Sequence, residues 1–280
     1  MPAPALELRC AGRTVALGHP QVMGVLNVTP DSFSDGGRYR DAQAAIEHGL
    51  AMVTEGAAFI DVGGESTRPG AAPVSTAEEL ARVVPVVRAL AATQAVICVD
   101  TSKPEVMAAA AAAGAGLIND VRALTAPGAL AAARAAGCAV CLMHMQGEPR
   151  TMQDAPRYAD VVAEVRAFLA ARLAACRAAG FSQGQLAIDP GFGFGKSPAH
   201  NLTLLTRLSE FASLGVPVLA GLSRKSWLGK LTGRPTGERL AGSLALAVIA
   251  ALNGARIIRA HDVAATVDAL KVVAALEGGG

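Results

Sequence analysis

The chain has 280 residues, of which 52% are hydrophobic and 4% aromatic, and its formal net charge is +2. This length suits one α/β barrel of roughly 250 residues with short extensions, so we expect a single domain over residues 1–280. A charge this close to neutral argues against a general nucleic-acid-binding protein.

The first element predicted along the chain is a β-hairpin within residues 5–20. Ala11 and Gly12 separate LELRC from RTVAL, and a short turn between two apolar runs is typical of a hairpin. We expect this hairpin to precede the main sheet and to cap one end of it. At the other end of the chain, Gly-Gly-Gly predicts a frayed tail over residues 278–280.

Eight short apolar runs then follow along the chain, and each ends in a polar residue of a type that commonly takes part in catalysis or ligand binding. Parallel strands that are buried on both faces have this continuous apolar character instead of an alternating pattern. The runs are residues 22–28, 59–67, 95–101, 117–121, 139–145, 186–191, 216–223 and 255–262.

Helical segments alternate with these strands, and several begin with Ser, Asp or Asn and end at Gly. Eight strand–helix units in one chain favour a (β/α)8 TIM barrel with the N-terminal hairpin over an open, doubly wound sheet. The segments are residues 41–56, 75–92, 103–115, 126–137, 158–180, 201–215, 238–255 and 262–278.

The polar strand ends predict the position of a functional site, because barrels of this kind carry active sites at the C-terminal ends of their strands. Three connections are long or rich in Gly and Pro, namely 29–41, 63–75 and 144–156, and long loops at that face are commonly functional. The polar strand ends are Asn27, Thr67, Asp100, Asn119, His144, Asp189, Ser223 with Lys225, and Arg259 with His261.

Asp100, Asn119 and Asp189 suggest a shared ligand that is rich in N–H donors. Each could instead satisfy backbone groups of its own loop, and for any one of them alone that is the favoured interpretation. Three such acceptors on different strands favour an amino-pyrimidinone edge, since a carboxylate accepts two parallel N–H bonds. The run DPGFGFGKS (189–197) does not match a P-loop, because the position that should be Gly is Pro190.

Arg259 and His261 lie two apart on the last predicted strand, so they share a side of it. The last strand of a closed barrel pairs with the first, which ends at Asn27. An arginine, a histidine and an amide at one corner suit an oxyanion or a phosphate, and Lys225 adds a nearby donor.

Nothing in the sequence indicates a membrane or secreted protein. No apolar stretch reaches the roughly 18 uncharged residues of a spanning helix, and the start lacks a secretory signal pattern. Five cysteines at irregular spacing favour reduced thiols and a cytoplasmic location. Cys138 and Cys141 should point to opposite faces of one strand, which favours two unreactive buried thiols over a redox or metal site.

The motifs together resemble the dihydropteroate synthase family over about residues 22–273. They are NVTPDSFSDGG (27–37), DVGGESTRPG (61–70), VDTSKPEV (99–106), INDV (118–121), CLMHMQG (141–147), DPGFGFGK (189–196), LSRKS (222–226) and IIRAHDV (257–263). The resemblance implies a (β/α)8 barrel of folate biosynthesis. It also implies joining of p-aminobenzoate to 6-hydroxymethyl-7,8-dihydropterin diphosphate, with release of pyrophosphate. Such enzymes need Mg2+, are sulfonamide targets and are usually homodimers.

The same resemblance implies roles for individual residues. Those implied to bind the pterin diphosphate are Thr67, Asp100, Asn119, Asp189, Lys225, Arg259 and His261, and Asn27 is implied to ligate Mg2+. Those implied to enclose p-aminobenzoate are Phe33, Arg68, Pro69, Phe194 and Ser226. His144 receives no direct role, and support behind the site is the favoured interpretation.

Two alternatives are weighed against this interpretation. A methyltetrahydrofolate:corrinoid methyltransferase would share a pterin-binding barrel but would not need the diphosphate corner or the FSDGG and STRPG loops. A catalytically silent paralogue would bind pterin or a partner without turnover, which the intact motifs argue against.

Overall fold

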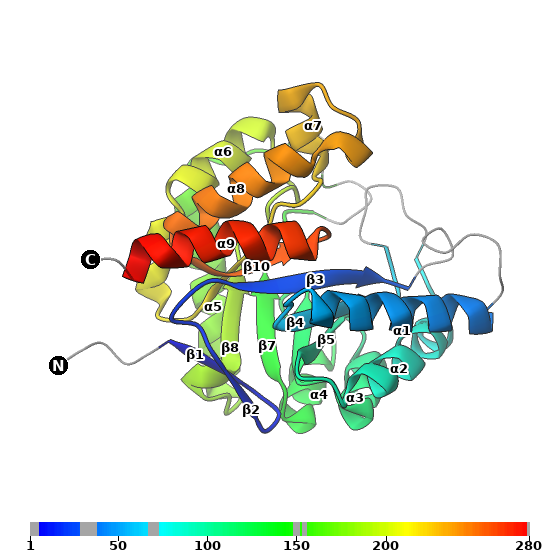
Figure 1. Cartoon of the computed structure of the whole chain (residues 1–280). Coiled ribbons are helices and arrows are strands. Elements are labelled where there is room, and N and C mark those ends of the chain that lie inside the picture. Colours follow the sequence, from blue (N-terminus) through cyan, green and yellow to red (C-terminus); the bar gives the residue numbers. More distant parts are fainter. Residues whose placement is uncertain (1–5, 29–37, 67–72, 148–151, 153–155, 279–280) are drawn as a thin grey trace.

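Eight parallel strands close into a barrel in the computed structural model, which describes residues 6–28, 38–66, 73–147, 152 and 156–278. The strands follow one another around the barrel in chain order, and the last pairs with the first, which confirms the predicted fold (Figure 1). They are β3 (Gln21–Asn27), β4 (Phe59–Gly63), β5 (Val96–Asp100), β6 (Leu117–Asp120), β7 (Ala139–Met143), β8 (Leu186–Asp189), β9 (Val218–Gly221) and β10 (Ala255–Ala260).

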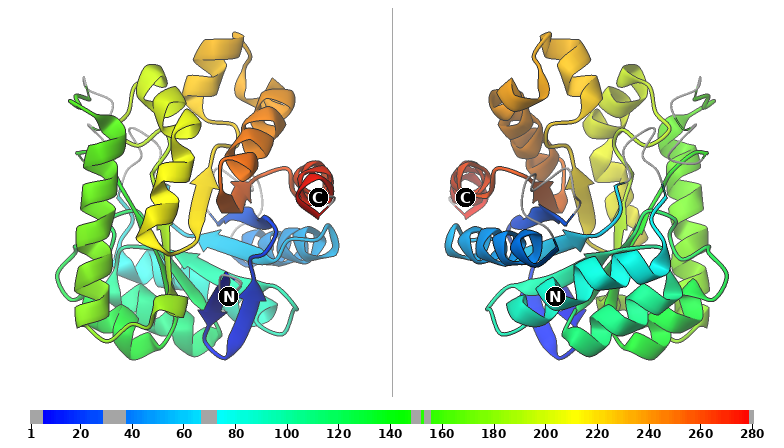
Figure 2. Two further views of the ribbon diagram at one scale, coloured as in Figure 1. Left: turned by 90° about the vertical axis from the view of Figure 1, so that its left-hand side faces the viewer. Right: turned by 90° about the vertical axis from the view of Figure 1, so that its right-hand side faces the viewer.

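Helices surround this barrel on its outside, as the two side views in Figure 2 show. The α-helices are α1 (Arg38–Thr54), α2 (Thr76–Leu90), α3 (Pro104–Ala113), α4 (Ala129–Ala136), α5 (Val161–Ala178), α6 (Pro198–Thr206), α7 (Ser226–Thr232), α8 (Leu240–Leu252) and α9 (Val263–Gly278). The 3-10 helices are η2 (Gln183–Gln185), η3 (Leu208–Leu214) and η4 (Thr236–Glu238).

Two details of the helices differ from the prediction. The segment expected as one helix over 201–215 is α6 followed by η3, with Arg207 between them in a non-helical conformation. The short helix α7 was not predicted, because its seven residues carry little periodic signal and begin only a few residues after β9. In addition, α8 packs only one face against the barrel, while Leu240, Ile249 and Leu252 are exposed on it.

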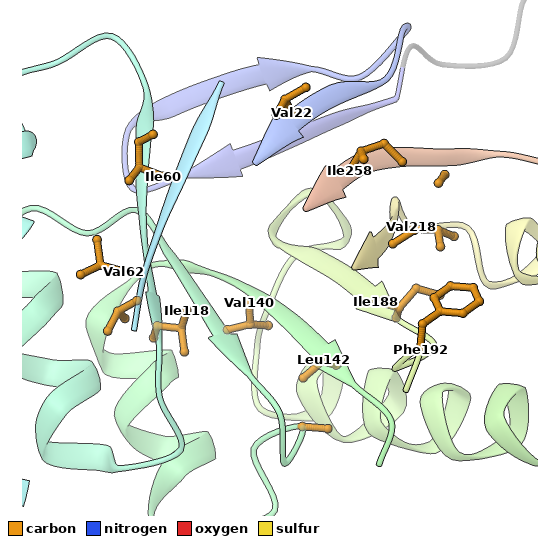
Figure 3. Packing of buried hydrophobic residues seen from close by; sticks show 14 of the residues in the cluster. Val22, Ile60, Val62, Ile118, Val140, Leu142, Ile188, Phe192, Val218 and Ile258 are labelled. Carbon is orange, nitrogen blue, oxygen red and sulfur yellow. The ribbon is translucent and has the colours of Figure 1, made fainter. Parts of the chain in front are cut away.

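The strands bury side chains on both faces, which explains their continuous apolar sequences. Outward-facing residues form a cluster with residues of the helices, and Figure 3 shows Val22, Ile60, Ile118, Val140 and Ile258 of this cluster. Inward-facing residues one position away form a second cluster inside the barrel. That inner cluster includes Met23, Phe59, Val96, Cys98, Leu117, Ala139, Cys141, Ala187, Leu219 and Ile257. Because side chains alternate along a strand, the two sets define which later residues face the interior.

The predicted hairpin is present as β1 (Glu7–Cys10) and β2 (Arg13–Ala16), which pair antiparallel. Its turn places Ala11 at φ 44° and Gly12 at φ 87°, the left-handed pair that two-residue hairpin turns require. Leu8, Cys10 and Leu17 belong to the inner cluster of the barrel. The hairpin therefore closes the end of the barrel at which the strands begin.

The five cysteines are all free and buried. Cys138 belongs to the outer cluster and Cys141 to the inner one, so they face opposite sides of the sheet as predicted. Burial raises the pKa of Cys138 to about 11 and that of Cys141 well above its usual value. Both thiols are therefore protonated and unreactive at neutral pH.

Candidate functional site

Polar residues replace apolar ones on the inward-facing positions near the C-terminal ends of the strands. Asp61, Asp100, Asn119, Asp189 and Arg259 each follow an inner-cluster residue by two positions, so they point into the same interior. Asp61, Asn119 and Asp189 are buried, and the side chain of Arg259 is 19% exposed. The alternation of the strands thus builds a charged layer directly on the apolar core.

Arg259 is the centre of this layer. Its Nε donates to Oδ2 of Asp61 at 2.6 Å, and its Nη2 donates to Oδ2 of Asp100 at 3.1 Å. Asn119 Nδ2 donates to the same Asp61 oxygen at 3.0 Å. Asp61 Oδ1 has no hydrogen-bond donor among the residues that the structure describes. The guanidinium therefore holds two carboxylates from different strands.

Carboxylates outnumber cations around Arg259, and burial strengthens the repulsion between the carboxylates. Burial and the neighbouring Asp61 raise the pKa of Asp100 to about 7, against the lowering effect of Arg259. Burial also raises the pKa of Asp189. These shifts mark the layer as a site that favours additional N–H donors, because each donor would stabilise a costly buried negative charge.

Asp189 and Lys225 form a second part of the layer. Gly191 N donates to Asp189 Oδ1 at 2.7 Å, which fixes the carboxylate at the end of β8. The Lys225 ammonium lies 4.3 Å from the centre of the Phe194 ring. Burial and the charge of Arg259 lower the pKa of Lys225 to about 8. Gly221 lies between the two parts of the layer, because a Cβ there would be in ordinary van der Waals contact with both Asp189 Oδ2 and Arg259 Cβ, each at 3.9 Å.

His261 is held by Ser223 at the corner where β9 and β10 end. Ser223 Oγ accepts from the His261 backbone N–H at 3.2 Å and lies 3.0 Å from Nδ1 of its ring. Burial, followed by the charge of Arg259, lowers the pKa of His261 to about 4, so the ring is neutral at pH 7. Because the hydroxyl already accepts from the backbone, its own proton can go to Nδ1. This favours the tautomer in which Nε2 carries the proton.

A further ion pair fixes the same corner. Arg224 forms a two-point contact with Asp262, in which Nε lies 3.0 Å from Oδ2 and Nη2 pairs with Oδ1. Arg224 has φ 56°, a left-handed conformation that is uncommon outside glycine, and its N–H donates to Ser243 Oγ at 3.0 Å. The segment between Ser223 and Lys225 is thereby tied to β10.

Asn27 lies at the end of β3, across Gly63 of β4 from Asp100. A Cβ on Gly63, which pairs in register with both residues, would lie 3.7 Å from Asn27 Oδ1 and 3.7 Å from Asp100 Cβ. Among the described residues there is no cluster of three or more His, Cys, Asp or Glu that could hold a metal by itself. The amide oxygen of Asn27 still suits Mg2+, which keeps waters and takes few protein ligands when phosphate oxygens complete its shell.

The base of the connection after β4 is anchored by charged groups. Lys103 pairs with Glu65 and with the buried Glu79 of α2. Glu65 Oε1 also accepts from Val74 N at 3.3 Å, and Arg82 donates to Gly64 O at 2.8 Å. These contacts fix both ends of the segment that contains the predicted residues Thr67, Arg68 and Pro69.

Most of the residues predicted from the sequence therefore come together at one mouth. Those brought together are Asn27, Asp100, Asn119, Asp189, Phe194, Lys225, Arg259 and His261. Ser226 is exposed and begins α7. Phe33, Thr67, Arg68 and Pro69 lie outside the described residues. The His144 side chain contacts Lys196, and the His144 backbone N–H donates to Asp189 O at 3.0 Å.

Three residues that organise this region were not predicted from the sequence. They are Asp61, Lys196, and Ser223 as the partner of His261. Asp61 carried a usable signal, since it is a carboxylate inside the otherwise apolar run FIDVG, at an interior position. Ser223 was noted only as a strand end, and its partner could not be read from the sequence. Lys196 lay within a quoted motif, but no sequence pattern indicated its burial.

Comparisons with known proteins agree with this geometry. The model of the pterin binding enzyme family matches residues 23–261. The dihydropteroate synthase of Escherichia coli (strain K12) is 56% identical over 271 residues, which cover 96% of each chain. A Xanthomonas albilineans dihydropteroate synthase with 4-aminobenzoic acid superposes with a TM-score of 0.92 at 55% identity, covering 98% of this chain and 99% of that one. A Yersinia pestis dihydropteroate synthase in a sulfonamide drug complex gives 0.93 at 52% identity, covering 97% and 99%.

Proposed function

Because the chain belongs to the pterin binding enzyme family, with dihydropteroate synthases as relatives over nearly its whole length, we propose that it is a dihydropteroate synthase. In this reaction the amine of p-aminobenzoate attacks the methylene of 6-hydroxymethyl-7,8-dihydropterin diphosphate. The bond from that carbon to the diphosphate oxygen breaks, the amine loses a proton, and 7,8-dihydropteroate and pyrophosphate leave. The observation that carries the proposal is the layer of Asp100, Asn119 and Asp189 beside the cations Arg259 and Lys225.

The pterin end of the site would use the buried acceptors. Asp100, Asn119 and Asp189 offer carboxylate and amide oxygens to the amino and ring N–H groups, and Lys225 offers a donor to the ring carbonyl side. The raised pKa values of Asp100 and Asp189 support this assignment, because a ligand that donates N–H groups would stabilise their buried negative charge.

The diphosphate end of the site would use Arg259, His261 and Asn27. Thr67, from the loop after β4, would join them. Arg259 keeps a permanent positive charge, since Asp61 and Asp100 hold its pKa above the usual range despite burial. His261 offers Nε2–H while its ring stays neutral. Both groups can stabilise the negative charge that gathers on the leaving diphosphate, and each preorganised donor of this kind is worth about 3–4 kcal/mol of barrier.

Mg2+ would be held at this end by Asn27 together with diphosphate oxygens. The amide oxygen of Asn27, which lies across Gly63 from Asp100, is of the oxygen type that this ion prefers. When bound, the ion neutralises charge on the diphosphate. No further protein ligand is required for this assignment.

The p-aminobenzoate end would lie above the pterin, between Phe194 and the loops that contain Phe33, Arg68 and Pro69. Phe194 is partly buried against Lys225 and offers an apolar wall. The Ser226 hydroxyl at the start of α7 and the Arg68 guanidinium supply donors for a carboxylate. The attacking arylamine is nucleophilic when neutral, so no strong general base is needed. Sulfonamides that mimic p-aminobenzoate would bind at this end.

A homodimer and a cytoplasmic location complete the proposal. Exposed apolar side chains on neighbouring helices support self-association, because they would be buried between two copies; they are Leu231 of α7, Leu240, Ile249 and Leu252 of α8, and Val272 and Leu276 of α9. The free thiols support a reducing compartment. None of the helices in the described part of the chain has both the length and the apolar character that crossing a bilayer needs.

A coupled assay for pyrophosphate release tests the function. With the pterin diphosphate and Mg2+ fixed and p-aminobenzoate varied, we expect saturable release and equimolar dihydropteroate. A silent paralogue would bind the pterin without release. A corrinoid methyltransferase would release no pyrophosphate and would instead transfer a methyl group from methyltetrahydrofolate. Absence of release with the pterin diphosphate bound would refute the proposal.

A further inference from the structure

Lys196 is a fully buried lysine that the mechanism above does not use. It lies at the end of the loop between β8 and α6, and only 1% of the residue is exposed. Its Nζ lies 2.9 Å from Gly191 O, 3.0 Å from Phe194 O and 3.0 Å from His144 Nδ1, with His144 O at 3.3 Å. These partners are carbonyl oxygens and an imidazole, and no carboxylate of the described residues pairs with it.

His144 is suited to accept from this ammonium. Burial and the charge of Lys196 lower the pKa of His144 to about 3, so the ring is neutral and its Nδ1 has a free lone pair. The ring packs edge-on against Phe168, with 5.1 Å between the ring centres. The unexplained polar end of β7 is therefore one wall of a cage around Lys196.

The loop itself is shaped to form the rest of the cage. Gly191, Gly193 and Gly195 have φ of 73°, 81° and 60°, so alternate residues take left-handed conformations that side chains rarely adopt. A Cβ on Gly191 would lie 1.9 Å from His144 O, which rules out any side chain there without movement of the backbone. The glycine pattern thus brings the loop carbonyls around the buried ammonium.

We propose that Lys196 is a positioning residue that holds the β8–α6 loop in the shape required by both substrates. Gly191, whose carbonyl accepts from Lys196, donates through its N–H to Asp189 Oδ1 at 2.7 Å. Phe194, whose carbonyl also accepts from Lys196, places its ring against Lys225. One cation therefore fixes the orientation of a carboxylate for the pterin and of an aromatic wall for p-aminobenzoate. The two substrate assignments rest on the proposed function.

The burial of Lys196 argues for a functional reason to keep this hydrogen-bond donor. Burial lowers the pKa of Lys196 to about 7, which reflects the cost of an ammonium without a paired carboxylate. An apolar side chain of similar volume would avoid that cost. It could not donate to Gly191 and Phe194, whose carbonyl oxygens would lose this donor.

The test compares Lys196→Met and His144→Phe with Lys271→Met, a control at an exposed lysine on α9. We expect Lys196→Met to fold with a lower unfolding midpoint, because buried acceptors lose their donor, while kcat/KM for p-aminobenzoate falls about tenfold or more through the loss of the same hydrogen bonds. His144→Phe keeps the ring packing and removes one acceptor, so it should show a smaller fall. The two effects should not add in the double variant, because both remove the same hydrogen bond.

Hydrogen exchange of the 191–195 amides gives a readout that does not depend on turnover. We expect faster exchange there in Lys196→Met than in the wild type, with the other strand ends unchanged. If the wild type lacks turnover, the proposed function fails, and the exchange experiment still decides whether Lys196 holds the loop. Wild-type kinetics with wild-type exchange in Lys196→Met would overturn the inference. Should that variant not fold, unaltered kinetics and exchange in His144→Phe would overturn it equally.

Discussion

Arg259 on β10 and Asp61 on β4 form a 2.6 Å hydrogen-bonded ion pair across the intervening strand β3. Asp61 has no exposed surface, so the pair belongs to the interior of the barrel as much as to the site. Arg259 is consequently oriented before any ligand arrives. The same ion pair therefore contributes both to the stability of the barrel and to the geometry of the site.

Removal of Arg259 should weaken both binding and folding. Arg259→Met leaves two carboxylates buried without their cation, so we expect a loss of about 3–5 kcal/mol of unfolding free energy at pH 8. The loss should shrink as the pH falls through the raised pKa of Asp100, because a neutral carboxyl no longer needs the cation. Denaturant titrations at pH 5 and pH 8 measure this. Arg256→Met is the control, since Arg256 lies on the same strand and pairs with Glu277 outside the site. Equal effects of the two variants would contradict the prediction.

The affinity for the pterin diphosphate should rise with pH on the acidic side and fall on the alkaline side. The pKa of Asp100 is raised to about 7, so below pH 7 the free enzyme must release a proton before the carboxylate can accept N–H groups, and affinity should rise from pH 5 to 7. The pKa of Lys225 is lowered to about 8, so its charge and the affinity should decline above pH 8. Calorimetric titration of the pterin diphosphate measures both changes. In Asp100→Asn the affinity should no longer rise between pH 5 and 7. If the rise persists in that variant, Asp100 is not the titrating group.

Ser223 should control which nitrogen of His261 carries the proton. In Ser223→Ala the ring loses the donor to Nδ1, so both tautomers become populated and kcat/KM for the pterin diphosphate should fall about tenfold, the loss expected for one hydrogen bond to a charged group. Ser223→Thr keeps the hydroxyl and should retain most of the activity. Nitrogen-15 NMR of the His261 ring reports the tautomer directly. A ring protonated on Nδ1 in the wild type would disprove this account.

Asn27 should set the requirement for Mg2+. We expect Asn27→Ala to raise the Mg2+ concentration for half-maximal pyrophosphate release about tenfold or more, since even outer partners of a metal site change affinity by that much. Chelation should abolish wild-type turnover, and added Mg2+ should restore it. An unchanged Mg2+ dependence in the variant would remove Asn27 from the metal site.

The loop residues Phe33 and Arg68 should affect the second substrate selectively. Phe33→Ala and Arg68→Ala should raise KM for p-aminobenzoate strongly while leaving the Kd of the pterin diphosphate within about threefold, because the groups that hold the pterin are on the strands. Lys230→Ala, at an exposed position on α7, is a surface control. If KM for p-aminobenzoate does not change, the assignment of these loops is wrong.

The barrel and most of its polar layer were predictable because both follow from the alternation of side chains along buried strands. Asp100, Asn119, Asp189 and Arg259 stood out as polar residues at the ends of apolar runs, and the chain order of the strands brought them to one mouth. The hairpin was predictable from its turn, which needs two left-handed residues. These features depend on local sequence and on the closure of one sheet.

Pairings across the barrel could not be predicted in the same way. Asp61 and Arg259 are 198 residues apart, and Lys196 and His144 are 52 apart, so their contacts depend on the shear of the barrel and on loop shape. Sequence alone also gave no sign that burial would bring the pKa of Lys196 to about 7. Charged groups whose partners are distant in the chain are therefore the part of this site that needed three-dimensional coordinates.

The hairpin at the foot of the barrel has a consequence for the order of events in catalysis. Leu8, Cys10 and Leu17 fill the end at which the strands begin, so among the described residues the polar layer is closed off from that end and faces the opposite one. On the proposed arrangement the pterin occupies the deeper position, and p-aminobenzoate lies between it and the solvent. The pterin diphosphate must then enter first, and a bound p-aminobenzoate analogue would trap it inside. Isotope trapping of the pterin diphosphate should accordingly become more efficient as p-aminobenzoate is raised.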